Sequence, residues 1–204
     1  MSKELIDKIR RIYFAFAQVR DGDVLNVRPQ FKNLPTGFAW LMDFNQGKSE
    51  EELRDRSLNL IANIASIKDH LKNYCDDKNK VFEGDALINS NMSVAVVHDL
   101  WNADKHGKLN QSRSGKHPKL QDVRQSLRLK TGTEAGSGVL FQMDFNGNSR
   151  VDAEIGGSAE LVLDGDVVDV GGNRLGKFQD ICESAVEAWE KELSNVGIPI
   201  ALIR

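Results

Sequence analysis

The stretch MSVAVVHDLWNADKHG, residues 92–107, decides how this chain is organised. Its first half is apolar almost all round a helix, which predicts a helix buried inside a bundle rather than one lying on a surface. Gly107 is the kind of residue at which such a helix commonly ends. A polar loop follows. After it, apolar residues no longer recur at helical spacing but alternate with polar ones. Residue 107 therefore marks the end of a helical part and the approach to a β part.

Apolar side chains recur at steps of three and four over residues 3–20 and again over residues 50–75. This spacing predicts two amphipathic helices, each with one buried face. A further helix is predicted over residues 88–106. Pro and Gly interrupt residues 23–49, where the segment FAWLMDF, residues 38–44, fits either a strand or a short helix.

Alternation of apolar and polar residues begins after a polar, basic loop at residues 108–121. It predicts an antiparallel meander of four or five strands over residues 122–171, with one apolar face that needs a cover. The dipeptides Asn146-Gly147 and Asp164-Gly165 indicate tight turns within this meander. Apolar residues at steps of three and four over residues 174–196 predict a C-terminal helix that packs on the sheet.

These segments predict an α+β protein with a helical bundle core, an antiparallel β-meander and a C-terminal helix packed on the sheet. We expect one domain over residues 1–204, with its helical part at about residues 1–107. A meander of this size has one apolar face and little of its own against which to bury it. No apolar run approaches the ~20 residues that cross a bilayer. The two cysteines are too few for a disulfide framework, so we expect a cytoplasmic protein outside the membrane.

The net charge of −3 hides a strong asymmetry along the chain. Residues 105–130 hold eight Lys or Arg and one acid, a local charge of +7, whereas residues 131–204 hold five basic and 13 acidic residues. The cationic segment predicts contacts with a nucleic-acid backbone. Alternatively, the acidic C-terminal third neutralises it within the molecule or across a dimer. The candidate phosphate-binding residues are Lys105, Lys108, Arg113, Lys116, Lys119, Arg124, Arg128 and Lys130.

Three hydrogen-bonding side chains converge on one strip at the end of the predicted helix over residues 88–106. At ~100° per residue, Asn102 and His106 lie about 40° apart, and Asp99 lies about 20° from His106. An imidazole titrates near neutral pH, so His106 is a candidate general base or acid. Asp99 would fix its tautomer, and Asn102 would hold a scissile phosphate or the imidazole. A structural interpretation stays open, in which His106 only caps the helix end and Asn102 satisfies backbone groups.

A long amphipathic helix followed by a second helix ending in Asn-x-x-Lys-His-Gly resembles the HEPN-like domains (higher eukaryotes and prokaryotes nucleotide-binding) over residues 50–107. This resemblance implies a small, typically dimeric helical bundle. It also implies metal-independent RNA cleavage in a toxin–antitoxin or phage-defence system. Active members carry an Arg directly before the polar residue. Asn102 and His106 match the polar and His positions, whereas Trp101 stands where that Arg belongs, so the bidentate phosphate clamp is missing.

Two functional hypotheses follow from these observations. The first is an RNA-directed protein, a metal-independent endoribonuclease in which His106 is the general base and Asn102 and Lys105 position the phosphate. The second is a non-catalytic binding or assembly module that forms a homodimer or binds a protein partner, which the Trp101 substitution favours. We expect no cofactor and no metal, because the four His and two Cys show no ligand spacing.

Overall fold

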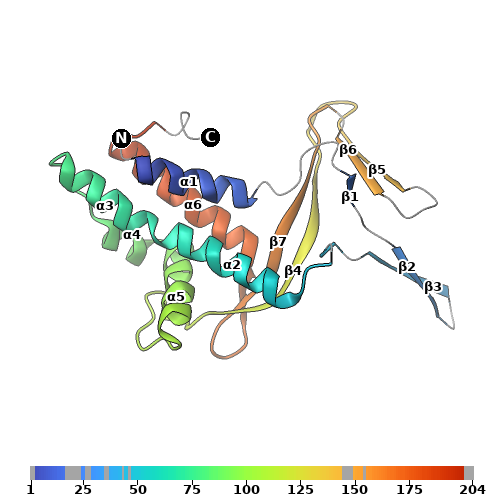
Figure 1. Cartoon of the computed structure of the whole chain (residues 1–204), viewed down its shortest axis with the longest axis horizontal. Helices are drawn as coiled ribbons and strands as arrows, with labels where there is room; N and C mark the ends of the chain where they lie inside the picture. The colour runs from blue at the N-terminus through green and yellow to red at the C-terminus, as the bar shows by residue number, and fades with distance from the viewer. Residues whose placement is uncertain are drawn as a thin grey trace. The chain divides into compact units, whose positions relative to one another are not determined.

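A computed structural model describes the chain over the following residues: 3–16, 24–25, 29–34, 37–42, 44–45, 47–143, 149–153 and 155–199. It is an α+β protein with helices, a three-stranded antiparallel sheet and a C-terminal helix that packs on that sheet, as predicted (Figure 1). Contacts group the chain into two compact units. The first holds Met1–Phe16, Glu51–Val123 and Leu163–Arg204, and the second holds Ala17–Glu50 and Arg124–Val162.

The first unit is mainly helical. Its helices are α1 (Lys3–Phe16), α2 (Glu50–Ala65), α3 (Ile67–Asp77), α4 (Gly84–Ser90), α5 (Met92–His106) and α6 (Phe178–Asn195). The predicted helix over residues 50–75 is divided at Ser66, whose hydroxyl donates back to the Asn63 carbonyl oxygen and so competes with the regular helix bonds. The predicted helix over residues 88–106 begins earlier and is divided at Asn91. The Asn91 side chain accepts from the Val94 amide and thereby caps α5.

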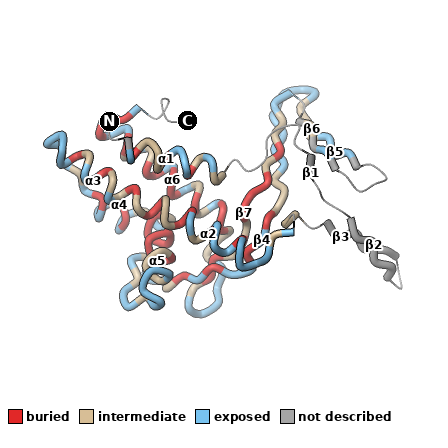
Figure 2. The backbone as a smooth tube through the Cα atoms, in the orientation of Figure 1, coloured by how far each residue is buried: buried red, intermediate tan, exposed pale blue. Residues whose placement is uncertain are grey.

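The core of the first unit lies around α5. Residues 94–100 of this helix are all buried, as its apolar pattern predicts, and the helix contacts α6 (Figure 2). Phe178 and Trp189 of α6 are fully buried in the same core. Burial of a large apolar side chain stabilises a fold by roughly 1.5–3 kcal/mol, so the packing of α6 is a major source of stability. None of the described helices is long and apolar enough to span a bilayer.

The sheet that α6 covers contains β4 (Lys119–Lys130), β7 (Ser158–Val168) and β8 (Arg174–Lys177), in the order β4–β7–β8. Buried residues of β4 and β7 join Phe178 and Cys182 in one hydrophobic cluster, and α6 also contacts β8. The prediction of a C-terminal helix packed on the sheet is therefore confirmed. Its predicted start is corrected, because residues 174–177 form β8 and the helix begins at Phe178.

The predicted turn at Asp164-Gly165 is wrong, because β7 runs through both residues. A Cβ atom at Gly165 would lie 2.9 Å from the backbone oxygen of Gln121, so this glycine allows β4 and β7 to approach closely. Strand β4 is irregular beside it, since Asp122 adopts a positive φ of 51°. The chain reverses instead over residues 169–173, where the Asp169 carboxylate accepts backbone hydrogen bonds.

The described part of the second unit is mainly strand. It holds β1 (Val24–Leu25), β2 (Pro29–Leu34), β3 (Gly37–Met42), β5 (Val139–Met143) and β6 (Ser149–Ala153), with the remaining parts of β4 and β7. β2 and β3 form an antiparallel hairpin, which settles residues 38–42 as strand. Among the described residues, β5 pairs with β6 and β6 pairs with β1, so the predicted single meander is divided between two sheets. The predicted turn at Asn146-Gly147 and the predicted helical residues 17–20 lie outside the described residues.

Candidate nucleic-acid interface

The C-terminal end of α5 carries Asn102 and His106. The helix ends at His106, and Gly107, with a φ of +69°, turns the chain away from the helix axis. His106 is exposed, and Asn102, one turn earlier, is half-buried. Across the part of the chain that the structure describes, neither side chain has a hydrogen-bond or ion-pair partner. Both polar groups are therefore free to meet a ligand at this helix end.

Asp99 lies on the same strip of α5 but faces the protein. It is fully buried, and its carboxylate accepts four hydrogen bonds of 2.6–2.9 Å from the loop after α5. The donors are the hydroxyls of Ser112 and Ser114 and the amides of Arg113 and Ser114. A buried carboxylate needs donors of this kind, because an uncompensated charge is costly to bury. Its hydrogen bonds go to this loop rather than to His106, which is a correction to the predicted role of Asp99 in fixing the imidazole.

The loop over residues 107–118, which we call the basic loop, is fixed at further points. The Ser112 hydroxyl oxygen accepts from the amides of Lys116, at 3.1 Å, and of His117, at 3.2 Å. The Lys116 carbonyl accepts from the Val170 amide, at 3.2 Å, which ties the loop to the turn after β7. These bonds give a loop of polar sequence a defined backbone conformation. The backbone positions from which its cationic side chains extend are therefore fixed.

The Arg113 side chain is directed towards α4. Its guanidinium donates to the Asn89 side chain, at 3.1 Å, and to the Asp85 carboxylate, at 3.3 Å. Lys68 of α3 donates to the same Asp85 oxygen, at 2.9 Å. The hydrogen bond from Lys68 is the main reason that the pKa of Asp85 lies below its ordinary value, and Arg113 adds to the effect. Arg113 is thus engaged by the protein itself.

The other cations of the first unit differ in their surroundings. Lys116 lies close enough to Asp169 to help lower the pKa of that carboxyl, after the larger contributions from Asn173 hydrogen bonds. Lys108 and Lys119 are exposed, and over the described ranges neither side chain has an ion-pair or hydrogen-bond partner. These two lysines are the candidates that most clearly remain available to a phosphate.

The remaining three candidates, Arg124, Arg128 and Lys130, belong to the second unit, on the later part of β4. Lys130 forms an ion pair with Glu160 at 3.4 Å. Together with the electrostatic effect of Lys116 on Asp169, this ion pair links the cationic segment to the acidic C-terminal third. Neutralisation within the molecule, the second alternative that the charge pattern leaves open, is therefore observed in part.

Trp101 is a feature of the site that sequence reasoning noted only as a departure from a motif. Its half-buried ring meets the imidazole of His98 edge to face, with ring centroids 5.9 Å apart and planes at 79°. The Lys105 ammonium lies over the same indole, 5.1 Å from the ring centroid. The signal that points to this arrangement is the spacing of Trp101 and Lys105, which are four residues apart on one helix.

His98 is a buried histidine that the sequence does not distinguish from the exposed ones. It is 6% exposed, and its Nε2 atom has no hydrogen-bond partner among the described residues. Burial lowers the pKa of His98 to about 4, and the positive charge of Lys68 acts in the same direction. The imidazole is therefore neutral near pH 7 and serves as a packing group between Trp101 and Trp189.

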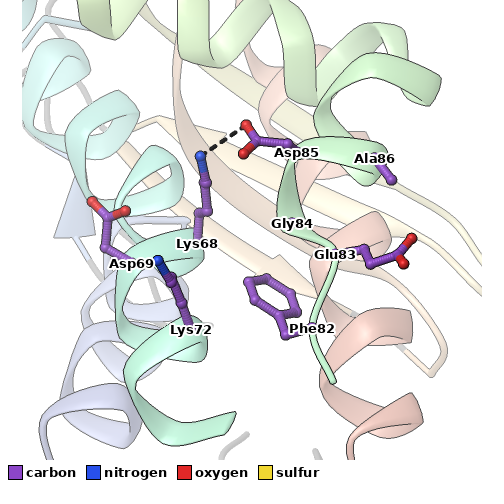
Figure 3. A pocket seen from close by; sticks show the side chains of 8 residues that line it. All are labelled: Lys68, Asp69, Lys72, Phe82, Glu83, Gly84, Asp85 and Ala86. Carbon is purple, nitrogen blue, oxygen red and sulfur yellow. Dashed lines mark hydrogen bonds and ion pairs between the residues drawn. The ribbon is translucent and has the colours of Figure 1, made fainter. Parts of the chain in front are cut away.

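A pocket of about 480 Å³ opens between α3 and the start of α4 (Figure 3). It is lined by Lys68, Asp69, Lys72, Phe82, Glu83, Gly84, Asp85 and Ala86. Its two lysines are outnumbered by three carboxylates, and the Lys68–Asp85 ion pair joins its walls (Figure 3). This mixture of charges favours no single sign of ligand.

The candidate interface therefore combines the open polar end of α5 with Lys108 of the basic loop and Lys119 at the start of β4. The described residues contain no group of three His, Cys, Asp or Glu side chains that would hold a metal ion. A comparison of this chain with family models, with curated proteins and with solved structures finds no match, so its resemblance to HEPN-like domains stands on the motif alone.

Proposed function

We propose that this protein binds RNA through the end of α5, the basic loop and Lys119 at the start of β4, and that it does so without cleaving the strand. The observation that carries this proposal is the hydrogen bonding of Asp99. Four bonds fix the basic loop next to a helix end whose Asn102 and His106 side chains have no intramolecular partner among the described residues. Cations on a fixed loop lose less freedom on binding than cations on an open chain.

The charge distribution supports a local contact. The whole chain has a net charge of −3, so attraction to a phosphate backbone has to come from the cationic segment. Lys105, Lys108 and Lys119 are exposed on this segment. Each phosphate that they neutralise would release counterions, which makes the affinity fall as salt rises.

The absence of cleavage follows from the groups near the imidazole. A general base is most effective when a second group orients it, and the carboxylate that lies on the same strip of the helix as His106, Asp99, is bonded to the loop. A guanidinium would stabilise the charge of the transition state, but Trp101 occupies the motif position and Arg113 is bonded to Asp85. Binding requires neither of these groups.

A second candidate function is metal-independent RNA cleavage, in which exposed His106 acts as the general base and Asn102 holds the scissile phosphate. The exposure of His106 beside the free Asn102 amide favours it. The HEPN-like motif supports the same reaction, together with a dimeric, cytoplasmic protein of a phage-defence or toxin–antitoxin system. A non-catalytic assembly role in such a system is compatible with RNA binding.

The binding proposal is tested by fluorescence anisotropy with a labelled RNA at several salt concentrations. The variant is Lys108→Ala/Lys119→Ala, and the matched control is Lys191→Ala, which removes an exposed charge from α6. We expect weaker binding in the double variant and a salt slope smaller by about 0.7 for each phosphate of the single strand that is no longer neutralised. Equal affinities for the double variant and the control, or binding that ignores salt, would overturn the proposal.

The same samples decide between binding and cleavage. The RNA is incubated with the protein in a chelator, and the products are separated on a gel. An intact RNA supports the binding proposal. Cleavage that disappears in His106→Ala, with an unchanged melting temperature, overturns it in favour of the nuclease.

A further inference from the structure

We propose that the Trp101 indole is the platform on which this interface stacks an unpaired base, so that the site prefers single-stranded RNA. This inference rests on the proposed function and adds the form of RNA that the site selects. An indole is the largest aromatic face that a protein offers, and every base has a face with which to stack on it. Bases inside a duplex are already stacked on their neighbours and cannot reach such a platform.

The position of Trp101 fits this role. It directly precedes Asn102 on α5, in the last turns of the helix beside the basic loop. The ring is half-buried, and contacts from the core side hold it in one orientation: His98 meets it edge to face at 79°. A ring held in this way loses little freedom when a base is added.

Lys105 covers the ring in the unbound protein. Its ammonium lies 5.1 Å from the ring centroid, although the lysine itself is exposed and its chain is long enough to move aside. An exposed lysine is held only weakly over an aromatic ring at the protein surface. When RNA binds, the phosphate backbone attracts this ammonium and a base takes its place on the indole. One exchange would thus supply both a phosphate contact and a stacking contact.

The neighbouring groups complete the arrangement. On a helix, Trp101 and Lys105 lie about 40° apart, and Asn102 lies about 60° from Lys105. The aromatic face, the cation and the free carboxamide therefore succeed one another around the helix end. This order suits a nucleotide, with its base on Trp101, its phosphate at Lys105 and the Asn102 amide able to bond either part.

The experiment compares two oligonucleotides of equal length and charge, a single-stranded RNA and the same strand without its bases. The wild-type protein should bind the strand with bases about tenfold more tightly, at the lower end of measured stacking contributions. Trp101→Leu keeps an apolar side chain at the core but has no aromatic face, so it should lose this preference. Trp101→Phe restores a ring and should recover most of it.

A matched control comes from the same unit. Tyr74 is a half-buried aromatic residue with Lys80 over its ring, at 5.8 Å, on another helix. Tyr74→Leu should leave the preference for bases unchanged, and melting temperatures show that each variant is folded. A wild-type protein that binds both strands equally, or a Trp101→Leu variant that keeps the preference, would overturn the inference while salt-dependent RNA binding remained intact. If no RNA is bound at all, the proposed function itself has failed.

Discussion

The replacement Asp99→Ala tests whether the buried carboxylate fixes the basic loop. The variant removes the single acceptor of four hydrogen bonds, two from hydroxyls and two from amides. Asp99 itself is fully buried, whereas Arg113 is exposed and Ser112 and Ser114 are half-buried. In the variant, the released donors can form hydrogen bonds to water once the loop opens. While the loop stays closed, these donors face the buried site of the missing carboxylate and have no acceptor.

The size of the effect follows from these contacts. Hydrogen bonds to a charged acceptor contribute about 1.5–3 kcal/mol each, but four bonds to one group do not add, and the released donors regain bonds to water. We expect the opening of the loop to become easier by about 2–4 kcal/mol. The exchange of the Arg113 and Ser114 amides should then rise by about 30-fold to about 1000-fold.

The measurement is hydrogen exchange at these two amides, with global stability followed in parallel by urea denaturation. Asp99→Asn should have a smaller effect, because its carboxamide oxygen can replace Oδ2, which accepts three of the four bonds, and its NH₂ group then faces only the Arg113 amide. Ser112→Ala removes one donor to Asp99 and the acceptor of the Lys116 and His117 amides, and it should cost about 1–3 kcal/mol. Unchanged exchange of the Arg113 and Ser114 amides in Asp99→Ala would refute the reasoning.

Three further predictions concern other parts of the first unit. The pKa of His98 is lowered to about 4, so the unfolded chain takes up a proton first as the pH falls. The contribution of His98 to the free energy of unfolding should be fully present above about pH 6.5 and decrease by about 3 kcal/mol towards pH 4, at 1.36 kcal/mol per unit of pKa. Urea denaturation at several pH values should show a weaker pH dependence in His98→Phe. Gly165→Ala should destabilise the protein by about 1–3 kcal/mol in thermal melts, because its Cβ atom would crowd the Gln121 carbonyl; an unchanged melting temperature would show that the strands can separate. Asp85→Asn should change the free energy of unfolding by less than about 1 kcal/mol, because its partners are partly exposed, and a larger loss would mean that the Lys68–Asp85–Arg113 contacts act as a network.

The periodic features of the sequence predict the fold class well. The apolar pattern of α5 and the amphipathic pattern of α6 indicate what each helix buries, and both helices are in the core. The places where helices divide were missed, because Ser66 and Asn91 act through local hydrogen bonds that do not alter the hydrophobic spacing. The turn at Asp164-Gly165 was predicted wrongly for a similar reason. The sequence does not distinguish a glycine in a turn from a glycine that lies against a neighbouring strand.

The candidate site was predicted only in part. Helical geometry brings Asn102 and His106 to the same helix end, and the structure leaves both groups open there. The same geometry also put Asp99 on that strip, but helical angles do not indicate that the loop after α5 folds back onto its carboxylate. Trp101 entered the sequence analysis only as a mismatch, because its contacts with His98 and Lys105 depend on side-chain orientation.

The anchoring of the basic loop at Ser112 and Ser114 has a consequence for engineering. Ser112 and Ser114 fix the middle of the loop and Gly107 begins it, so residues 108–111 form a short, mostly exposed bridge between two fixed points. Lengthening such a bridge costs little closure entropy, about 0.6 kcal/mol for each doubling. Foreign peptides grafted at Lys108–Gln111 should therefore be displayed beside the helix end without disturbing the packing beneath it.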